Sequence, residues 1–257
     1  MKIENYGAGH RCAAVLRLLL SFCEENPTPG LNRIIILPIP TSRDGVHLSG
    51  TDRLVSEVSG TVSVGDAVCG YAIPKKDKEM MLRRGARIYD AAEDEEFLLE
   101  NARLTAEGTL GHILTGSKKS VRDMKVGVVG YGRIGRYLTN MLLSLGCAVR
   151  VYTSKNATRL ELGECGVESE YMSADDGIIP NLKGLDIIVN TAPKPLGKTF
   201  EGGIAQGLCV IEVASGDNFA GVSGVLRLPS LPDRLYPESS AVLYFDGIRR
   251  HLFGGGV

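Results

Sequence analysis

The 257-residue sequence has no tryptophan, and only 6% of its residues are aromatic. Proteins that bind single-stranded nucleic acids stack the bases on aromatic rings, so this composition disfavours such a role. The formal net charge is −1, which provides no overall basic field for a phosphate backbone. We therefore expect no nucleic-acid partner.

The cysteines form no metal-binding or disulfide pattern. None of the six belongs to a C-x-x-C pair, and they are scattered over the chain as Cys12, Cys23, Cys69, Cys147, Cys165 and Cys209. Zinc sites and small disulfide-bonded domains require closely spaced sets of cysteines. We expect reduced thiols, no metal site and a cytoplasmic location, because disulfides rarely persist in reducing compartments.

No apolar run is long enough to span a membrane. The run near the start, CAAVLRLLLSF at residues 12–22, is interrupted by Arg17 and falls short of the roughly 20 residues that a span requires. It also lacks the basic cluster and the small-residue cleavage site of a signal peptide. The segment therefore predicts an amphipathic helix in a soluble protein, with no membrane partner.

Short apolar segments alternate with helical patterns along the chain. In the first hundred residues, LNRIIILPIP, DAVCGY and ARIYD predict strands, and KKDKEMMLRRG predicts a helix that ends at Gly85. The segment 91–116 predicts one long helix or two in sequence. From Lys125 the alternation continues, with KVGVVG, AVRVYT, DIIVNTA and LCVIEVAS as strands. Such alternation is typical of doubly wound parallel sheets.

We therefore predict an α/β protein with two doubly wound parallel-sheet domains, the second a Rossmann dinucleotide-binding domain. The first domain, residues 1–104, forms the substrate side in this interpretation, and the second spans residues 105–237. The segment PESSAVLYFDGIRRHLF predicts a final helix. We expect residues 238–257 to join the first domain.

A glycine-rich loop follows the strand that begins at Lys125. Residues 130–135 read G-x-G-x-x-G between an apolar strand and a helix, which is the context that gives this short motif its meaning. The glycines permit a tight turn, close approach of a pyrophosphate, and close packing of helix on strand. We expect cofactor contacts from the whole loop, which comprises Gly130, Tyr131, Gly132, Arg133, Ile134 and Gly135.

The end of the next strand bears on the choice of cofactor. An NAD site usually has an acid there, about 20 residues past the first glycine, to bind the ribose hydroxyls. The segment VYTSKNATR has none and instead offers Thr153, Ser154, Lys155 and Arg159. Hydroxyls and cations suit a 2′-phosphate. We predict NADP, with NAD as the alternative, and expect Lys155 and Arg159 to hold the phosphate.

Two further strand ends are candidates for cofactor contacts, because ligands bind at the carboxyl ends of strands in open α/β sheets. DIIVNTAP ends in Asn190, Thr191, Ala192 and Pro193. VIEVAS ends in Ala214 and Ser215. For each segment the alternative is an ordinary turn.

The chain resembles the dipicolinate synthase A family. The similarity is distributed over roughly residues 30–252 and includes the glycine loop and DIIVNTAP, together with IIILPIPTSRDGV, NARLTAEGTLGHIL, VIEVAS and LPSLPDRLYPESSA. The family's cofactor domain is in turn similar to that of the D-2-hydroxyacid dehydrogenases. The late loop differs, because Pro229-Ser230 and Pro232-Asp233 stand where the family tends to have proline-glycine twice.

The resemblance implies a function in sporulation. A dihydro- or hydroxytetrahydrodipicolinate-type cyclic diacid would be oxidised to dipicolinate, with NADP⁺ accepting the hydride. The resemblance also implies a partner, a small flavoprotein-like B subunit. We further expect a homo-oligomer.

A dicarboxylate substrate requires hydrogen-bond donors. Ser42 and Arg43 follow a predicted strand, and Thr105 and Thr109 lie in TAEGT, so we expect these four to contact the substrate. Glu107, in the same motif, is the predicted general base, with His112 as the alternative. Serine and threonine also favour turns and helix starts, so local capping is the competing interpretation.

Three other functions remain open. A D-2-hydroxyacid dehydrogenase would need an arginine at the end of the VIEVASGDN strand, which has none, and His251 lies in a terminal helix. A shikimate dehydrogenase-like enzyme would share the VNTAP loop, but the catalytic lysine-aspartate pair of that group has no clear counterpart in this sequence. The altered PSLPDR loop suggests a third function, a non-catalytic NADP-binding regulatory subunit.

Overall fold

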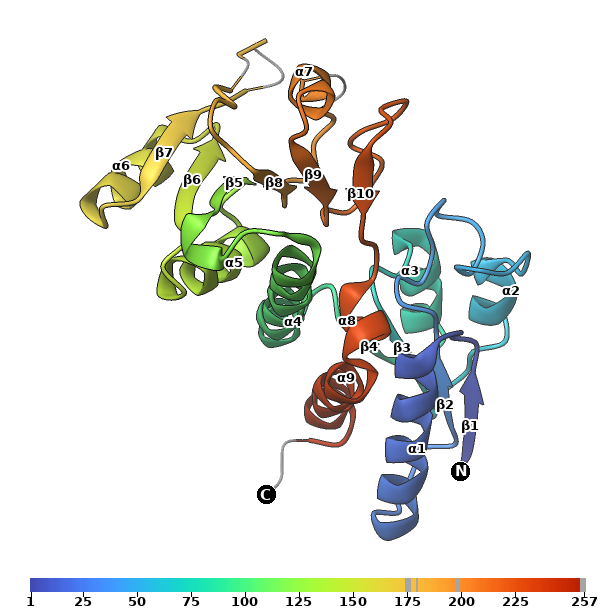
Figure 1. Cartoon of the computed structure of the whole chain (residues 1–257). Helices are drawn as coiled ribbons and strands as arrows, with labels where there is room; N and C mark the ends of the chain where they lie inside the picture. Colours follow the sequence, from blue (N-terminus) through green and yellow to red (C-terminus); the bar gives the residue numbers. More distant parts are fainter. Residues whose placement is uncertain (174–176, 179, 197–198, 255–257) are drawn as a thin grey trace. The chain divides into compact units, whose positions relative to one another are not determined.

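The computed structural model describes residues 1–173, 177–178, 180–196 and 199–254. The chain divides into two compact units (Figure 1). Unit 1 comprises residues 1–101 and 232–257, and unit 2 comprises residues 102–231. The division falls within α4 (Glu95–Gly116), which is one continuous helix rather than two.

Unit 1 contains a four-stranded parallel sheet in the order β1-β2-β3-β4 within the described residues. Its strands are β1 (Lys2–Asn5), β2 (Arg33–Ile36), β3 (Asp66–Gly70) and β4 (Arg87–Asp90). The helices are α1 (His10–Glu25), α2 (Val55–Ser59), α3 (Lys75–Arg83), the start of α4, α8 (Leu231–Leu235), whose first residue belongs to unit 2, and α9 (Pro237–Leu252).

The central strand β2 is apolar on both faces, as a strand buried between two helical layers must be. Ile34 and Ile36 pack in a cluster with residues of α1 and α9. Ile35 and Leu37 pack in a second cluster with residues of α2 and α3. The helices therefore cover both faces of this sheet.

The last helix completes the core of unit 1. α1 and α9 pack side by side (Figure 1). The ring of Phe22 on α1 lies 5.5 Å from that of Phe245 and 5.0 Å from that of Phe253. The final residues of the segment 238–257 that we expected to join this unit, 255–257, lie outside the described residues.

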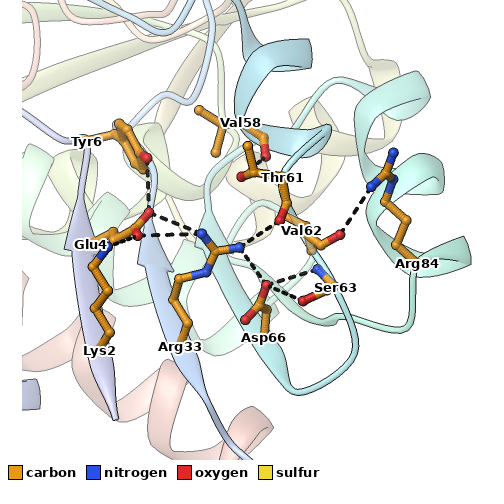
Figure 2. Close-up of polar contacts among 10 residues, drawn as sticks. All are labelled: Lys2, Glu4, Tyr6, Arg33, Val58, Thr61, Val62, Ser63, Asp66 and Arg84. Atoms are coloured by element: carbon orange, nitrogen blue, oxygen red, sulfur yellow. Dashed lines mark hydrogen bonds and ion pairs between the residues drawn. The ribbon is translucent and has the colours of Figure 1, made fainter.

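A polar network ties together the amino ends of the strands in unit 1 (Figure 2). Arg33 Nη2 donates to Asp66 Oδ2 at 2.6 Å and to the carbonyl of Thr61 at 2.9 Å. The backbone N–H of Ser63 donates to the same oxygen of Asp66 at 2.9 Å. Burial opposes ionisation of Asp66, but these donors outweigh it, so the pKa of Asp66 is lowered.

Unit 2 contains a six-stranded parallel sheet in the order β10-β9-β8-β5-β6-β7 within the described residues. Its strands are β5 (Lys125–Val129), β6 (Ala148–Thr153), β7 (Glu168–Tyr171), β8 (Ile187–Asn190), β9 (Cys209–Glu212) and β10 (Val225–Arg227). The helical elements are the rest of α4, the 3₁₀ turn η1 (Val121–Asp123), α5 (Arg133–Ser144), α6 (Asn156–Glu164) and α7 (Glu201–Ala205).

The strand order of unit 2 reverses beside β5. The chain runs outward through β6 and β7 and then returns to place β8 on the other side of β5. Ligands of open α/β sheets bind outside the carboxyl ends of the strands at such a switch point. The predicted fold class, two parallel-sheet α/β domains with a Rossmann-type second domain, is confirmed.

The sequence patterns missed the two edge strands of unit 2. β7 reads ESEY and is stabilised by cross-strand charge, since Arg150 Nε donates to Glu168 Oε1 at 2.5 Å. β10 is only three residues long. Neither carries the apolar signal that marks a central strand. Among the described residues, no helix is long and apolar enough to cross a membrane.

Candidate cofactor site

The glycine loop lies at the switch point, between β5 and α5. Gly130 has φ of 89°, a left-handed conformation that glycine adopts without strain. Its N–H donates to the carbonyl of Tyr152 on β6 at 2.8 Å. On the other side, Thr191 Oγ1 donates to the carbonyl of Val129 at 2.9 Å. The loop is thus held between the carboxyl ends of β6 and β8.

Each glycine of the motif has a different steric environment. A Cβ on Gly135 would collide with the carbonyl oxygen of Gly130, so a side chain would separate α5 from the loop. A Cβ on Gly130 would lie 3.0 Å from Thr191 Oγ1. A Cβ on Gly132 would meet nothing within 4 Å, which leaves open space at the start of α5. These residues fit a pyrophosphate bound at the helix N-terminus.

A cavity of about 410 Å³ opens above this loop. Its walls come from the carboxyl ends of β5, β6 and β8 and from the first turn of α6. Of the predicted cofactor residues, nine line it: Gly130, Tyr131, Gly132, Thr153, Ser154, Lys155, Thr191, Ala192 and Pro193. Sequence reasoning missed other lining residues, among them Arg136, Thr158, Met172 and Lys194.

The end of β6 and the start of α6 form the polar end of the cavity. Thr153 Oγ1 accepts a hydrogen bond from the N–H of Lys155 at 3.2 Å, and Lys155 is the N-cap residue of α6. Ser154 and Thr158 add hydroxyls to the same wall. None of the described lining residues is acidic. The N-terminus of α6 and the ammonium group of Lys155 therefore favour an anion here.

Arg136, one turn into α5, is a second cation on the cavity wall. It forms a bidentate pair with Glu161 on α6, at 2.8 and 3.1 Å. Its guanidinium lies over the ring of Tyr131, 4.6 Å from the centroid. The hydrogen bonds that Arg136 donates to Glu161 raise the pKa of Arg136. The available signal in the sequence was the position of Arg136 directly after the third glycine of the motif, but this position was not among the predicted cofactor contacts.

The remaining predicted cofactor residues lie off the cavity wall: Arg133, Ile134, Gly135, Arg159, Asn190, Ala214 and Ser215. Ile134 packs against the hydrophobic core of unit 2. Arg159 lies one turn further along α6 than Lys155, and its Nε is buried with no hydrogen-bond partner among the described residues. Direct cofactor contacts from these residues stay predictions.

Asn190 organises the loop at the end of β8. It is 1% exposed, its Oδ1 accepts from the N–H of Ala192 at 3.0 Å, and its Nδ2 donates to the carbonyl of Ala192 at 3.0 Å. The same Nδ2 lies 3.1 Å from Glu212 Oε1 at the end of β9. Glu212 is 5% exposed and also accepts from the N–H of Ala214. A buried carboxylate thus holds the loops that carry both predicted strand ends.

Sequence reasoning did not identify Glu212. Burial is the main influence on its carboxyl and raises its pKa, against the hydrogen bonds from Asn190, Asn218 and Ala214. An acid within the apolar run VIEVAS was the available signal, because an unpaired acid is rarely buried in a strand.

The predicted substrate residues of unit 1 belong to a hydrogen-bonded loop. Ser42 Oγ donates to Asp44 Oδ1 at 3.0 Å and accepts from the N–H of Gly45 at 2.9 Å. Asp44 also accepts from His47 Nδ1 at 2.7 Å. Arg43 is exposed. Ser42 caps its own loop in this structure, and substrate contacts from Ser42 and Arg43 stay predictions.

The other predicted substrate residues and the predicted base lie on the part of α4 that belongs to unit 2. Thr109 is fully buried and donates to the carbonyl of Thr105 at 2.7 Å. Glu107 is partly exposed and accepts from Arg103 Nη1 at 2.5 Å. His112, the alternative base, is half-buried one turn later. Their roles toward a substrate stay predictions.

Comparison with known proteins agrees with this geometry. Residues 98–195 match the model of the family described as D-isomer specific 2-hydroxyacid dehydrogenase, NAD binding domain. A comparison with curated protein sequences gives no match. The matched segment contains the glycine loop and the ends of β6 and β8. The chain is therefore of the class of NAD(P)-dependent oxidoreductases, and its cofactor is a nicotinamide dinucleotide.

Among solved structures, the fold is similar to that of the dipicolinate synthase A chain from Bacillus subtilis. The TM-score is 0.74 at 18% identity, covering 98% of this chain and 96% of that one. The corresponding dipicolinate synthase chain from Bacillus halodurans gives a TM-score of 0.73 at 18% identity, with 100% and 98% covered. A transhydrogenase from Sinorhizobium meliloti gives 0.59 at 17% identity, with 84% and 72% covered. The resemblance to the dipicolinate synthase A family is thus confirmed in the fold.

Proposed function

We propose that the chain is an NADP-dependent oxidoreductase that oxidises a dihydro- or hydroxytetrahydrodipicolinate-type cyclic diacid to dipicolinate. The observation that carries the cofactor choice is the polar end of the cavity. Ser154, Lys155 and Thr158 lie at the start of α6, Arg136 lines the same cavity, and no described lining residue is acidic. These groups suit the additional phosphate of NADP, which an acid would repel.

The substrate class rests on the likeness to the dipicolinate synthase A family, which extends over both units rather than over the cofactor domain alone. A dihydrodipicolinate loses one hydride and one proton on conversion to the aromatic diacid. The hydroxylated precursor loses water first. In either case two electrons leave the ring, which matches one nicotinamide.

When bound, the oxidised nicotinamide would accept the hydride. The chain's own residues would bind and orient both partners. The loop at Thr191–Pro193, held by Asn190 and Glu212, closes one side of the cavity. Glu107 would take the ring proton, and its ion pair with Arg103 would keep the carboxylate in one position. Aromatisation is strongly favourable, so this base has little to contribute to the driving force.

A coupled assay tests the proposal. The cyclic intermediate is generated in situ, and the full chain and NADP⁺ are added with or without the candidate flavoprotein-like B subunit. We expect NADPH and dipicolinate to appear together. NADPH binding without oxidation of any cyclic imino diacid would support a regulatory subunit instead. Turnover of a D-2-hydroxyacid or of shikimate would assign one of the other dehydrogenase functions.

The same proposal includes the biological setting. A sporulation role, a cytoplasmic location and a B-subunit partner follow from dipicolinate synthesis, and we propose a homo-oligomer. Light scattering of the chain alone and with the partner tests the last two. A monomer that ignores the partner would contradict them.

A further inference from the structure

Arg11 is a buried cation whose guanidinium has no hydrogen-bond partner among the described residues. It is the second residue of α1 and is only 6% exposed. Among the described residues, none accepts a hydrogen bond from its guanidinium, and none forms an ion pair with it. Burial lowers the pKa of Arg11, and the nearby carboxylate of Asp233 offsets this only in part. A buried charge without hydrogen bonds is costly, so such a group calls for an acceptor.

The surroundings of Arg11 belong to the carboxyl edge of the unit 1 sheet. The turn that ends in Gly9 follows β1 and leads into the helix that carries Arg11. Tyr71, which interacts electrostatically with Arg11, directly follows β3. Parallel α/β sheets bind ligands at these carboxyl ends. A second neighbour, Tyr244 on α9, is fully buried, and its hydroxyl has no hydrogen-bond partner among the described residues. Neither the Arg11 guanidinium nor the Tyr244 hydroxyl therefore has a hydrogen-bond partner among the described residues.

Asp233 limits the charge that this region accepts. Its Oδ1 accepts a hydrogen bond from the backbone N–H of Arg11 at 2.8 Å, which already places one carboxylate at the N-terminus of α1. A group with two charges of its own, such as a phosphate dianion, would be repelled beside this carboxylate, whereas the single charge of one carboxylate group would balance the guanidinium. Arginine's planar fork matches the two oxygens of a carboxylate.

We propose that Arg11 binds one carboxylate of the substrate, a small organic diacid, at the carboxyl edge of the unit 1 sheet. The substrate identity rests on the proposed function. Arg11 binds rather than reacts.

Thermal shift with dipicolinate as the probe tests this on the full chain with NADP⁺ present. We expect dipicolinate to raise the melting temperature of the wild type. Arg11→Lys keeps the charge but loses the fork, and it should weaken dipicolinate binding at least tenfold with unchanged NADPH affinity. Arg17→Lys is the matched control, because Arg17 lies on the same helix, is exposed and pairs with Glu238. It should behave as the wild type.

Equal dipicolinate affinity in wild type and Arg11→Lys would overturn the inference, as would a wild type that ignores dipicolinate or shifts only with inorganic phosphate. Arg11→Met separates binding from folding. If Arg11 has no partner in the ligand-free chain, the melting temperature of Arg11→Met without ligand should equal or exceed that of the wild type. A clear fall in the melting temperature would assign a structural role to Arg11. If no oxidation occurs but Arg11-dependent dipicolinate binding persists, only the proposed reaction fails. An unchanged KM in an active Arg11→Lys variant removes only this inference.

Discussion

Asn190 and Glu212 face each other in register at the carboxyl ends of β8 and β9, and Asn190 Nδ2 lies 3.1 Å from Glu212 Oε1. The pair connects a buried carboxylate to the loop that lines the cofactor cavity. Neither side chain is on the cavity wall. The arrangement shapes the site through the backbone of Ala192 rather than by touching the cofactor.

Glu212→Gln tests this relationship. The glutamine keeps one acceptor oxygen, but its NH₂ group would replace Glu212 Oε2, which accepts from Asn190 Nδ2, so donor would face donor there and the loop should lose part of its anchor at a cost of about 1–3 kcal/mol. We expect a lower melting temperature and NADPH affinity reduced about tenfold, by calorimetry. Glu164→Gln, on the exposed face of α6, is the control and should change neither. An unchanged affinity in Glu212→Gln would show that the loop does not depend on the carboxylate.

The pH dependence of this carboxyl has a defined sign. Because burial raises the pKa of Glu212 above its ordinary value of 4.5, the folded chain binds its proton more tightly than the unfolded chain. This contribution to the free energy of unfolding is complete below pH 4.5 and is lost as the pH rises through the folded pKa. Denaturant titrations should show this loss in the wild type and not in Glu212→Gln. Parallel pH profiles would contradict it.

Lys155 and Arg159 should differ in their effects, although both were predicted to hold a 2′-phosphate. Lys155 lines the cavity and Arg159 does not. We expect Lys155→Ala to weaken NADPH binding by about 10- to 100-fold, which corresponds to the loss of one charge-assisted hydrogen bond. The affinity for NADH should change little. Arg159→Ala should have the smaller effect. Equal losses for NADPH and NADH would show that the phosphate lies elsewhere.

Gly135→Ala should disrupt the glycine loop. The added Cβ would meet the Gly130 carbonyl, so α5 and the loop must separate at a cost of about 1–3 kcal/mol. Cofactor affinity and melting temperature should both fall. Gly163→Ala is the control, since its Cβ would meet nothing within 4 Å on α6 and should stabilise the helix slightly. Wild-type cofactor affinity in Gly135→Ala would refute the close approach.

Asp66→Asn probes the structural network of unit 1. Removing the charge leaves Arg33, which is largely buried, without its main partner, and we expect a loss of about 3 kcal/mol in the free energy of unfolding. Since the pKa of Asp66 is lowered from 3.8, its contribution is present above that pH and is lost as the pH falls further. The variant should therefore show a flatter acid limb in denaturant titrations, and a limb as steep as the wild type's would exclude this role.

The parts of the fold that sequence predicted are those with strong local signals. Apolar β2 and the G-x-G-x-x-G turn at Gly130 depend on neighbours in the chain, so periodicity and motif context suffice. Polar β7 depends on pairing with β6, which no local pattern shows. Sequence patterns did not identify Arg136, Glu212 and Arg11 for the same reason. Their importance comes from partners, or the lack of them, contributed by distant segments.

The most direct test of the central claim is the stoichiometry of a single enzymatic oxidation. Dipicolinate and NADPH are quantified together as the cyclic diacid is consumed by the chain, with NAD⁺ in a parallel reaction. The account predicts one NADPH for each dipicolinate and a clear preference for NADP⁺. Cofactor that binds normally while no dipicolinate forms, or an equal or faster reaction with NAD⁺, would contradict it.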